Sequence, residues 1–95
     1  MFMQTINSLV TLQNLEDLAS RSNFRAGKAI AEDAEISFEK KNSFNVIAKI
    51  KYSGGEGRTV QMSSTPKGLK WKCTCTNRKN IFCKHCVAAC LAIIR

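Results

Sequence analysis

Three cysteines and the only histidine of this 95-residue chain fall within thirteen residues near its end. They are Cys73, Cys75, Cys83 and His85, with the spacing C-x-C-x7-C-x-H. Thiolate and imidazole are ligands that Zn2+ prefers, and four of them close a structural tetrahedron. This segment constrains the fold more than any other, because the backbone must bring both pairs to one point.

The spacing of each pair predicts its local structure. Residues two apart in an extended chain point to the same side, so Cys73 and Cys75 can both reach one ion from the end of a strand. Residues two apart on a helix point nearly opposite ways. We therefore expect Cys83 just before a helix and His85 in its first turn.

A competing ligand set exists, because Cys86 follows His85 directly. Cys83 and Cys86 are three residues apart, a spacing that also converges at a helix start. Residue types and spacing alone leave His85 and Cys86 both open as the fourth ligand. Cys90 is interpreted as a core residue or an unpaired thiol, since free cysteine packs well as a small apolar side chain.

The motif resembles a SWIM-type zinc finger, in which C-x-C is followed after a short loop by C-x-H. Cys83-Lys84-His85-Cys86 and the small apolar residues after it are similar to that family's closing helix, and residues 24–28 (FRAGK) resemble its lead-in. The resemblance covers residues 19–94. It implies one structural zinc ion and favours His85 over Cys86. As partners it implies nucleic acid or a RecA-like recombinase paralogue in DNA repair.

The net charge of +8 is unevenly distributed. Residues 1–56 carry seven basic and seven acidic side chains, whereas residues 57–95 carry eight basic side chains and no acidic one. A basic segment without acids is typical of a surface that binds a polyanion. We expect contacts with nucleic acid, DNA in preference to RNA, from five residues of this segment: Lys70, Lys72, Arg78, Lys79 and Lys84.

An enzymatic role is not expected. Four protein ligands leave a zinc ion no open position for water. No carboxylate lies between residues 57 and 95 to act as a general base, and the single histidine is already assigned to the metal. The site is therefore predicted to be structural.

The cysteine count and the apolar runs indicate a soluble, intracellular protein, cytoplasmic or associated with the nucleoid or nucleus. Five clustered cysteines without a recognisable secretory signal favour metal binding over disulfides. The longest apolar run, from Cys86 to Ile94, is far shorter than the ~20 residues of a membrane span.

Two helices are predicted before the strands. Residues 5–21 have apolar side chains at helical spacing on one face, namely Leu9, Leu12, Leu15, Leu18 and Ala19. Thr5 or Asn7 is the expected N-cap. A short second helix is predicted from Phe24 to Ala31, capped by Ser22 or Asn23, although Gly27 has a low helix propensity.

Residues 34–73 alternate between apolar and polar side chains, which predicts three or four antiparallel strands with turns at residues 40–43, 53–57 and 65–68. In the last strand Leu69, Trp71 and Cys73 share the inner face, so Lys70 and Lys72 point outward. Lys49 and Lys51 are expected on the same outer face.

The final helix is predicted to begin near Lys84 and to turn Val87, Cys90, Leu91 and Ile94 inward. It is apolar nearly all round, so its other side must be covered by the N-terminal helix, by a second copy of the chain through self-association, or by a partner protein. The whole sequence is therefore predicted to be one α+β domain: an N-terminal helix or helix pair, a three- to four-stranded antiparallel meander, and a zinc site that joins the last strand to the C-terminal helix. Residues 1–21 are assigned to the N-terminal helix, and residues 22–95 to the SWIM-like sheet and zinc-finger unit.

Overall fold

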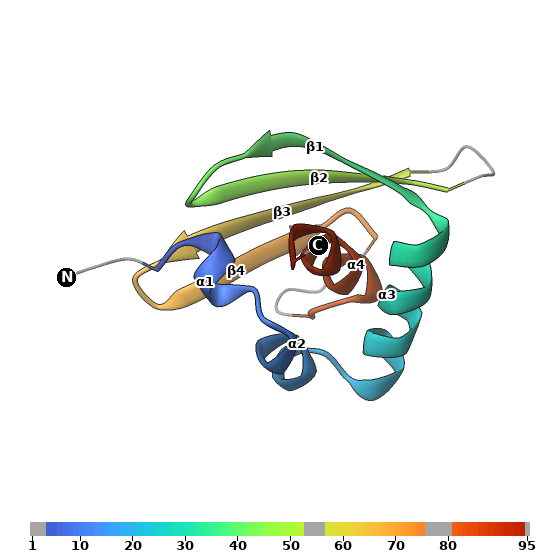
Figure 1. The fold of residues 1–95 in the computed structure, drawn as a ribbon, viewed down its shortest axis with the longest axis horizontal. Helices are drawn as coiled ribbons and strands as arrows, with labels where there is room; N and C mark the ends of the chain where they lie inside the picture. Colours follow the sequence, from blue (N-terminus) through green and yellow to red (C-terminus); the bar gives the residue numbers. More distant parts are fainter. Residues whose placement is uncertain (1–3, 53–56, 76–80, 95) are drawn as a thin grey trace.

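The computed structural model describes residues 4–52, 57–75 and 81–94. A four-stranded antiparallel sheet in the order β1-β2-β3-β4 lies on one side, and the described helices all lie on the other (Figure 1). The elements are α1 (Ile6–Leu9), α2 (Leu12–Leu18), α3 (Arg21–Asp33), β1 (Glu35–Lys41), β2 (Asn45–Lys51), β3 (Gly57–Thr65), β4 (Gly68–Cys73) and α4 (Lys84–Ile94). The predicted α+β class and the antiparallel meander are confirmed.

The sheet has one apolar and one polar face, as the alternation predicts. On β2, Val46, Ala48 and Ile50 are buried towards the helices, while Lys49 and Lys51 are exposed. The β3–β4 turn requires a glycine, because Gly68 has a φ of 117°, a conformation that side chains disfavour. The outer face, opposite the helices, is called the open face below.

The prediction of one continuous helix over residues 5–21 is wrong, because the chain forms two shorter helices there, α1 and α2. Thr5 caps α1, but Val10 leaves helical geometry and Thr11 caps a new helix by accepting a hydrogen bond from the Asn14 amide at 3.1 Å. Threonine favours such caps over helix interiors, because its side chain competes for backbone hydrogen bonds. The apolar face is also only partly inward: Leu15 and Ala19 are buried, but Leu12 and Leu18 are 54% and 39% exposed.

The second predicted helix starts earlier and ends later than expected. Ser20, rather than Ser22 or Asn23, accepts the capping hydrogen bond from the Asn23 amide at 3.2 Å, and α3 continues to Asp33. Gly27 lies inside this helix and is buried against α4. Its low propensity is tolerated because close packing at this position excludes a side chain.

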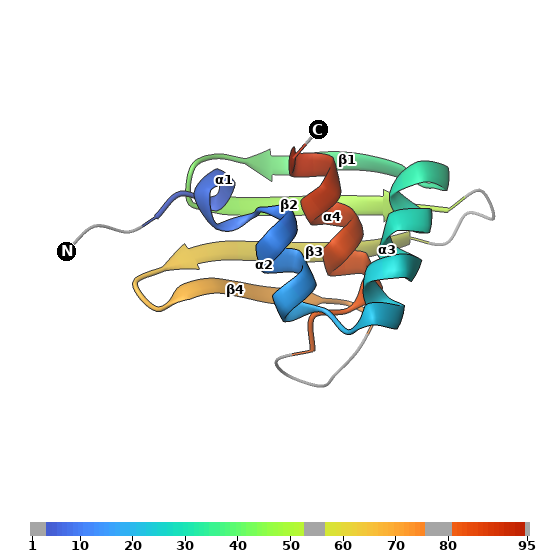
Figure 2. The ribbon, with the colours of Figure 1, turned by 60° about the horizontal axis from the view of Figure 1, so that its bottom comes forward.

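The final helix is the centre of the fold. α4 begins at Lys84, as predicted, and lies across the sheet between α2 and α3 (Figure 2). It is buried from His85 to Leu91, so its cover comes from within the chain, but mainly from α3 and only in part from the N-terminal segment that was expected to cover it. α3 is its main helical neighbour, with α2 also in contact. Ile94, predicted to face inward, is instead 42% exposed at the end of the helix.

Candidate metal centre

The structure brings the two predicted ligand pairs together between the end of β4 and the start of α4. Cys73 is the last residue of β4, Cys75 lies two residues beyond, Cys83 immediately precedes α4, and His85 is in its first turn. Their ligand atoms all lie within 4.8 Å of one another. Cys75 is exposed and the other three are buried, so the cluster sits at the edge of the core.

The distances fit one tetrahedral zinc ion. The Cys75 and Cys83 sulfurs are 3.5 Å apart, and the Cys83 sulfur is 3.9 Å from Nδ1 of His85. With Zn–S near 2.3 Å and Zn–N near 2.1 Å, a tetrahedron separates its ligand atoms by roughly 3.6–3.8 Å. The donor set of three sulfurs and one imidazole nitrogen suits zinc, and four protein ligands make a structural site.

The thiols of the cluster have shifted pKa values, because they are partly buried and hydrogen-bond to one another. Hydrogen bonds from the Cys73 and Cys86 thiols, together with a contact to His85, lower the pKa of Cys83 far below its ordinary value. The same contact with Cys83 raises the pKa of Cys73. Burial is the main cause that raises the pKa of Cys75. A zinc ion in this cluster would take its sulfur ligands as thiolates.

The two other cysteines belong to the core. The Cys86 sulfur is fully buried 3.7 Å from that of Cys83, but it is not among the atoms that lie mutually within 4.8 Å. The Cys90 sulfur lies 3.4 Å from the Met62 sulfur, and burial raises its pKa to about 12. The geometry thus favours His85 over Cys86 and leaves Cys90 as a packing residue.

Aromatic packing holds the second ligand pair against the sheet. Trp71 and Phe82 meet edge to face with ring centroids 5.0 Å apart. The indole Nε1 of Trp71 donates to the Ile81 carbonyl at 3.1 Å. Phe82 is buried in the core, at 2% exposure. Because Trp71 lies two residues before Cys73, these contacts fix Cys83 relative to the first pair.

Tyr52 is a site residue that sequence reasoning missed. Its hydroxyl oxygen lies 2.6 Å from Nε2 of His85, across 33 positions of the chain. Burial raises the pKa of Tyr52 above its ordinary value, an effect that nearby Arg58 opposes. The sequence offered no signal for this contact, since Tyr52 only continued the alternation of β2.

The predicted nucleic-acid residues do not share one element. Lys70 and Lys72 are exposed on β4 and point to the open face, because Leu69, Trp71 and Cys73 alternate with them towards the helices. Lys84 is exposed in the first turn of α4, in the helical layer. Arg78 and Lys79 lie outside the described residues.

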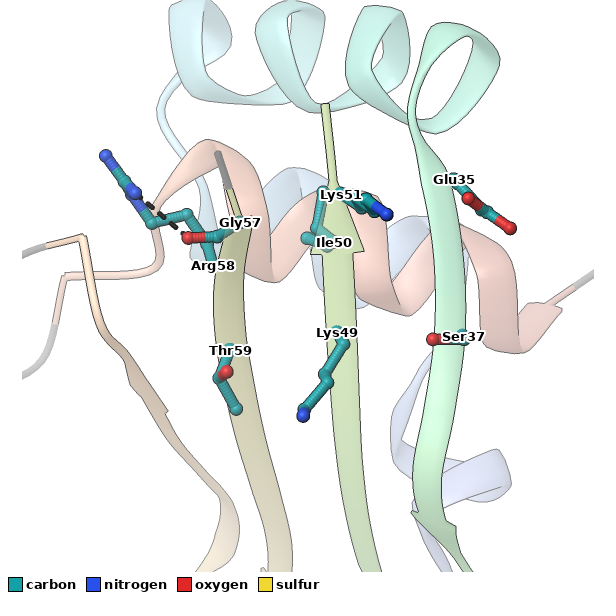
Figure 3. Close-up of a pocket in the computed structure, with 8 residues that line it drawn as sticks. All are labelled: Glu35, Ser37, Lys49, Ile50, Lys51, Gly57, Arg58 and Thr59. Carbon is teal, nitrogen blue, oxygen red and sulfur yellow. Dashed lines mark hydrogen bonds between the residues drawn. The ribbon is translucent and has the colours of Figure 1, made fainter. Parts of the chain in front are cut away.

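The open face has a shallow hollow of about 470 Å³ over β1, β2 and β3 (Figure 3). Both lysines of β2 at this hollow have an acidic neighbour: Lys49 forms a 3.1 Å ion pair with Glu39, and Lys51 lies opposite Glu35 in the strand register. β4 differs, because its register partners on β3 are neutral. Gln61 faces Lys72 and Ser63 faces Lys70.

No described helix is long and apolar enough to cross a membrane. No curated protein and no solved structure matches this chain. The SWIM zinc finger family model matches residues 58–94, a narrower range than the expected 19–94, so the lead-in at residues 24–28 lies outside the match. The match begins in β3 and includes β4, all four clustered ligands and α4. Residues 58–94 of this chain therefore match a SWIM zinc finger, and their Cys/Cys/Cys/His cluster fits one structural zinc ion.

Proposed function

We propose that this zinc-finger protein binds nucleic acid, DNA in preference to RNA, through the β4 side of the open face. One observation carries the proposal: Lys70 and Lys72 project together from this face, within a segment of 39 residues that has no acidic side chain. Lys84, which lies in the helical layer and not on the open face, and the two cations of the C-x-C to C-x-H loop, Arg78 and Lys79, are the further proposed contacts.

Charge on the open face supports β4 as the contact strand. Lys49 is already paired with Glu39, so its charge is largely compensated. Around Lys70 and Lys72 the cross-strand neighbours are Ser63 and Gln61, which are hydrogen-bonding groups without charge. The positive excess is therefore on β4, where phosphate oxygens would gain the most.

The side chains on the open face favour phosphate contacts over base stacking. Among the described strand residues no aromatic side chain points to this face: Trp71 packs on Phe82 towards the helices, and Tyr52, just past β2, contacts His85. Proteins that bind single strands commonly stack bases on aromatic rings. Lysines that contact only phosphates bind without reading sequence, so a duplex with weak sequence preference is the proposed ligand.

Zinc supports this function without taking part in chemistry. Lys72 immediately precedes the ligand Cys73, and Lys84 lies between the ligands Cys83 and His85. A metal that fixes both backbone segments holds these cations in place before binding, which lowers the entropy lost on association. No catalytic step is proposed.

A salt titration tests the proposal. The zinc-loaded protein is titrated into a fluorescently labelled duplex at several salt concentrations, and anisotropy gives Kd. Five phosphate contacts predict a log–log slope of about −4.5, because each contact releases condensed counterions. An affinity that barely changes between low and moderate salt would refute the proposal. Equal affinity for duplex DNA and duplex RNA would refute the DNA preference alone.

A protein-binding adaptor, for example a partner of a RecA-like recombinase paralogue, is the second candidate function. α4, one feature on which it rested, is covered within the chain by the sheet, α2 and α3. The exposed Leu12 and Leu18 on α2 are the observation that still favours it. Leu12→Ser with Leu18→Ser should then abolish co-purification of a partner while leaving duplex binding unchanged.

A further inference from the structure

The contact between Tyr52 and His85 joins a third element to the metal centre. The Tyr52 hydroxyl oxygen lies 2.6 Å from Nε2 of His85, and the rings meet nearly perpendicular at 78°. On the other side of the same imidazole, Nδ1 lies 3.9 Å from the Cys83 sulfur. His85 is only 4% exposed, so its two ring nitrogens are both committed to partners inside the protein.

The chemistry of imidazole makes these two contacts interdependent. A neutral imidazole has one nitrogen with a lone pair and one that carries a proton. Zinc takes the lone pair, so the other nitrogen must donate its N–H to an acceptor. In metal sites this acceptor is usually a carboxylate, a backbone carbonyl or water, and it fixes the ring orientation of the ligand. Residues 57–95 contain no carboxylate, and the structure places a phenolic oxygen at this position.

We propose that Tyr52 is a positioning residue of the zinc centre: its hydroxyl oxygen accepts the Nε2–H of His85, and this fixes Nδ1 as the nitrogen that binds zinc. Tyr52 directly follows β2, whereas the four ligands come from β4, α4 and the chain between them. It therefore connects the middle of the sheet to the site. Tyr52 also lies before residue 58, where the match to the family model begins. The proposal does not depend on nucleic-acid binding.

The first experiment identifies the zinc-binding nitrogen directly. The chain has one histidine and one tyrosine, so the ring signals of His85 and Tyr52 need no assignment among alternatives. Long-range 1H–15N spectra of the zinc-loaded full chain, labelled with 15N-histidine, should show Nδ1 bound to metal and Nε2 carrying the proton. Nε2 bound to metal would overturn the proposal, because Tyr52 could not then accept its proton.

The second experiment removes only the acceptor. Tyr52→Phe keeps the ring and should weaken zinc binding by about 10–100-fold in competition with a chromophoric chelator, the range found for such outer partners of metal ligands. Co2+ in place of zinc should give a shifted visible spectrum in this variant. Zinc affinity and Co2+ spectrum both equal to wild type would overturn the proposal.

Ser64→Ala is the matched control. Ser64 is buried in β3, and its hydroxyl donates to the Gln4 carbonyl, away from the cluster. This variant loses a hydroxyl hydrogen bond of the same sheet, so it should lower stability and leave zinc affinity unchanged. If Ser64→Ala weakens zinc as much as Tyr52→Phe does, the effect is general destabilisation and the proposal fails. If Tyr52→Phe does not fold, the wild-type 15N spectrum decides alone.

Discussion

Gly27 of α3 lies directly against Val87 of α4, so closely that a Cβ atom on Gly27 would be 2.4 Å from the Val87 Cβ. The same added atom would be 2.7 Å from the Lys84 carbonyl oxygen, which is backbone and cannot rotate away. The glycine thus sets the distance between α3 and the helix that carries His85. Its position in a helix follows from packing, since propensity alone disfavours it.

Gly27→Ala should therefore destabilise the protein, although alanine is the better helix former. Overpacking costs about 1–3 kcal/mol, against a propensity gain of about 1 kcal/mol. We expect a net loss of up to about 2 kcal/mol in the free energy of urea unfolding of the zinc-loaded protein. Lys28→Ala, at the exposed neighbouring position, should stay within about 0.5 kcal/mol of wild type. A stabilised Gly27→Ala variant would contradict the close contact between Gly27 of α3 and Val87 of α4.

Removal of the metal should lower the melting temperature substantially. Free zinc at 100 times Kd stabilises the folded state by about 2.7 kcal/mol. At about 4–8 °C per kcal/mol for a chain of this size, addition of a strong chelator should lower Tm by at least about 10 °C. Native mass spectrometry before and after chelation should report the loss of one zinc ion. A structural zinc site would be contradicted if the protein held no zinc before chelation and the chelator left Tm unchanged.

Substitutions at the adjacent residues His85 and Cys86 should show which of the two is the fourth zinc ligand. His85→Ala removes a nitrogen of the cluster and should reduce zinc content sharply, whereas Cys86→Ala should leave one zinc bound and cost about 1 kcal/mol of stability, because it only trims a buried side chain. Metal content is measured by native mass spectrometry at equal zinc supply. If zinc is lost on changing Cys86 and kept on changing His85, Cys86 is the fourth ligand and His85 is not.

Removing the two lysines of β4 should weaken nucleic-acid binding and lower its salt dependence. Lys70→Gln with Lys72→Gln eliminates two proposed phosphate contacts, so the log–log salt slope should fall in magnitude by about 2. The matched control is Arg25→Gln with Lys28→Gln, which removes the same charge from exposed positions on α3. Equal effects of both double variants would mean that net charge, and no particular surface, determines binding.

Much of the fold was predictable because it depends on local chemistry. The alternation in residues 34–73 predicted the strands, and the parity of Trp71 and Cys73 placed Lys70 and Lys72 on the outer face. The spacing of Cys83 and His85 placed the start of α4 within a residue. The N-terminal segment was harder: a threonine at position 11 reads equally as a helix residue or a cap, and only packing of Leu15 against the core decides.

The sequence by itself determined which atoms are available for a zinc ion and that they occur as two pairs, because ligand type and spacing are fixed along the chain. The tertiary structure decided what surrounds them. Tyr52 reaches His85, and Gly27 admits Val87, only because distant segments fold against one another. Such contacts join residues that are far apart in the sequence, so the local periodicity of apolar and polar residues does not predict them.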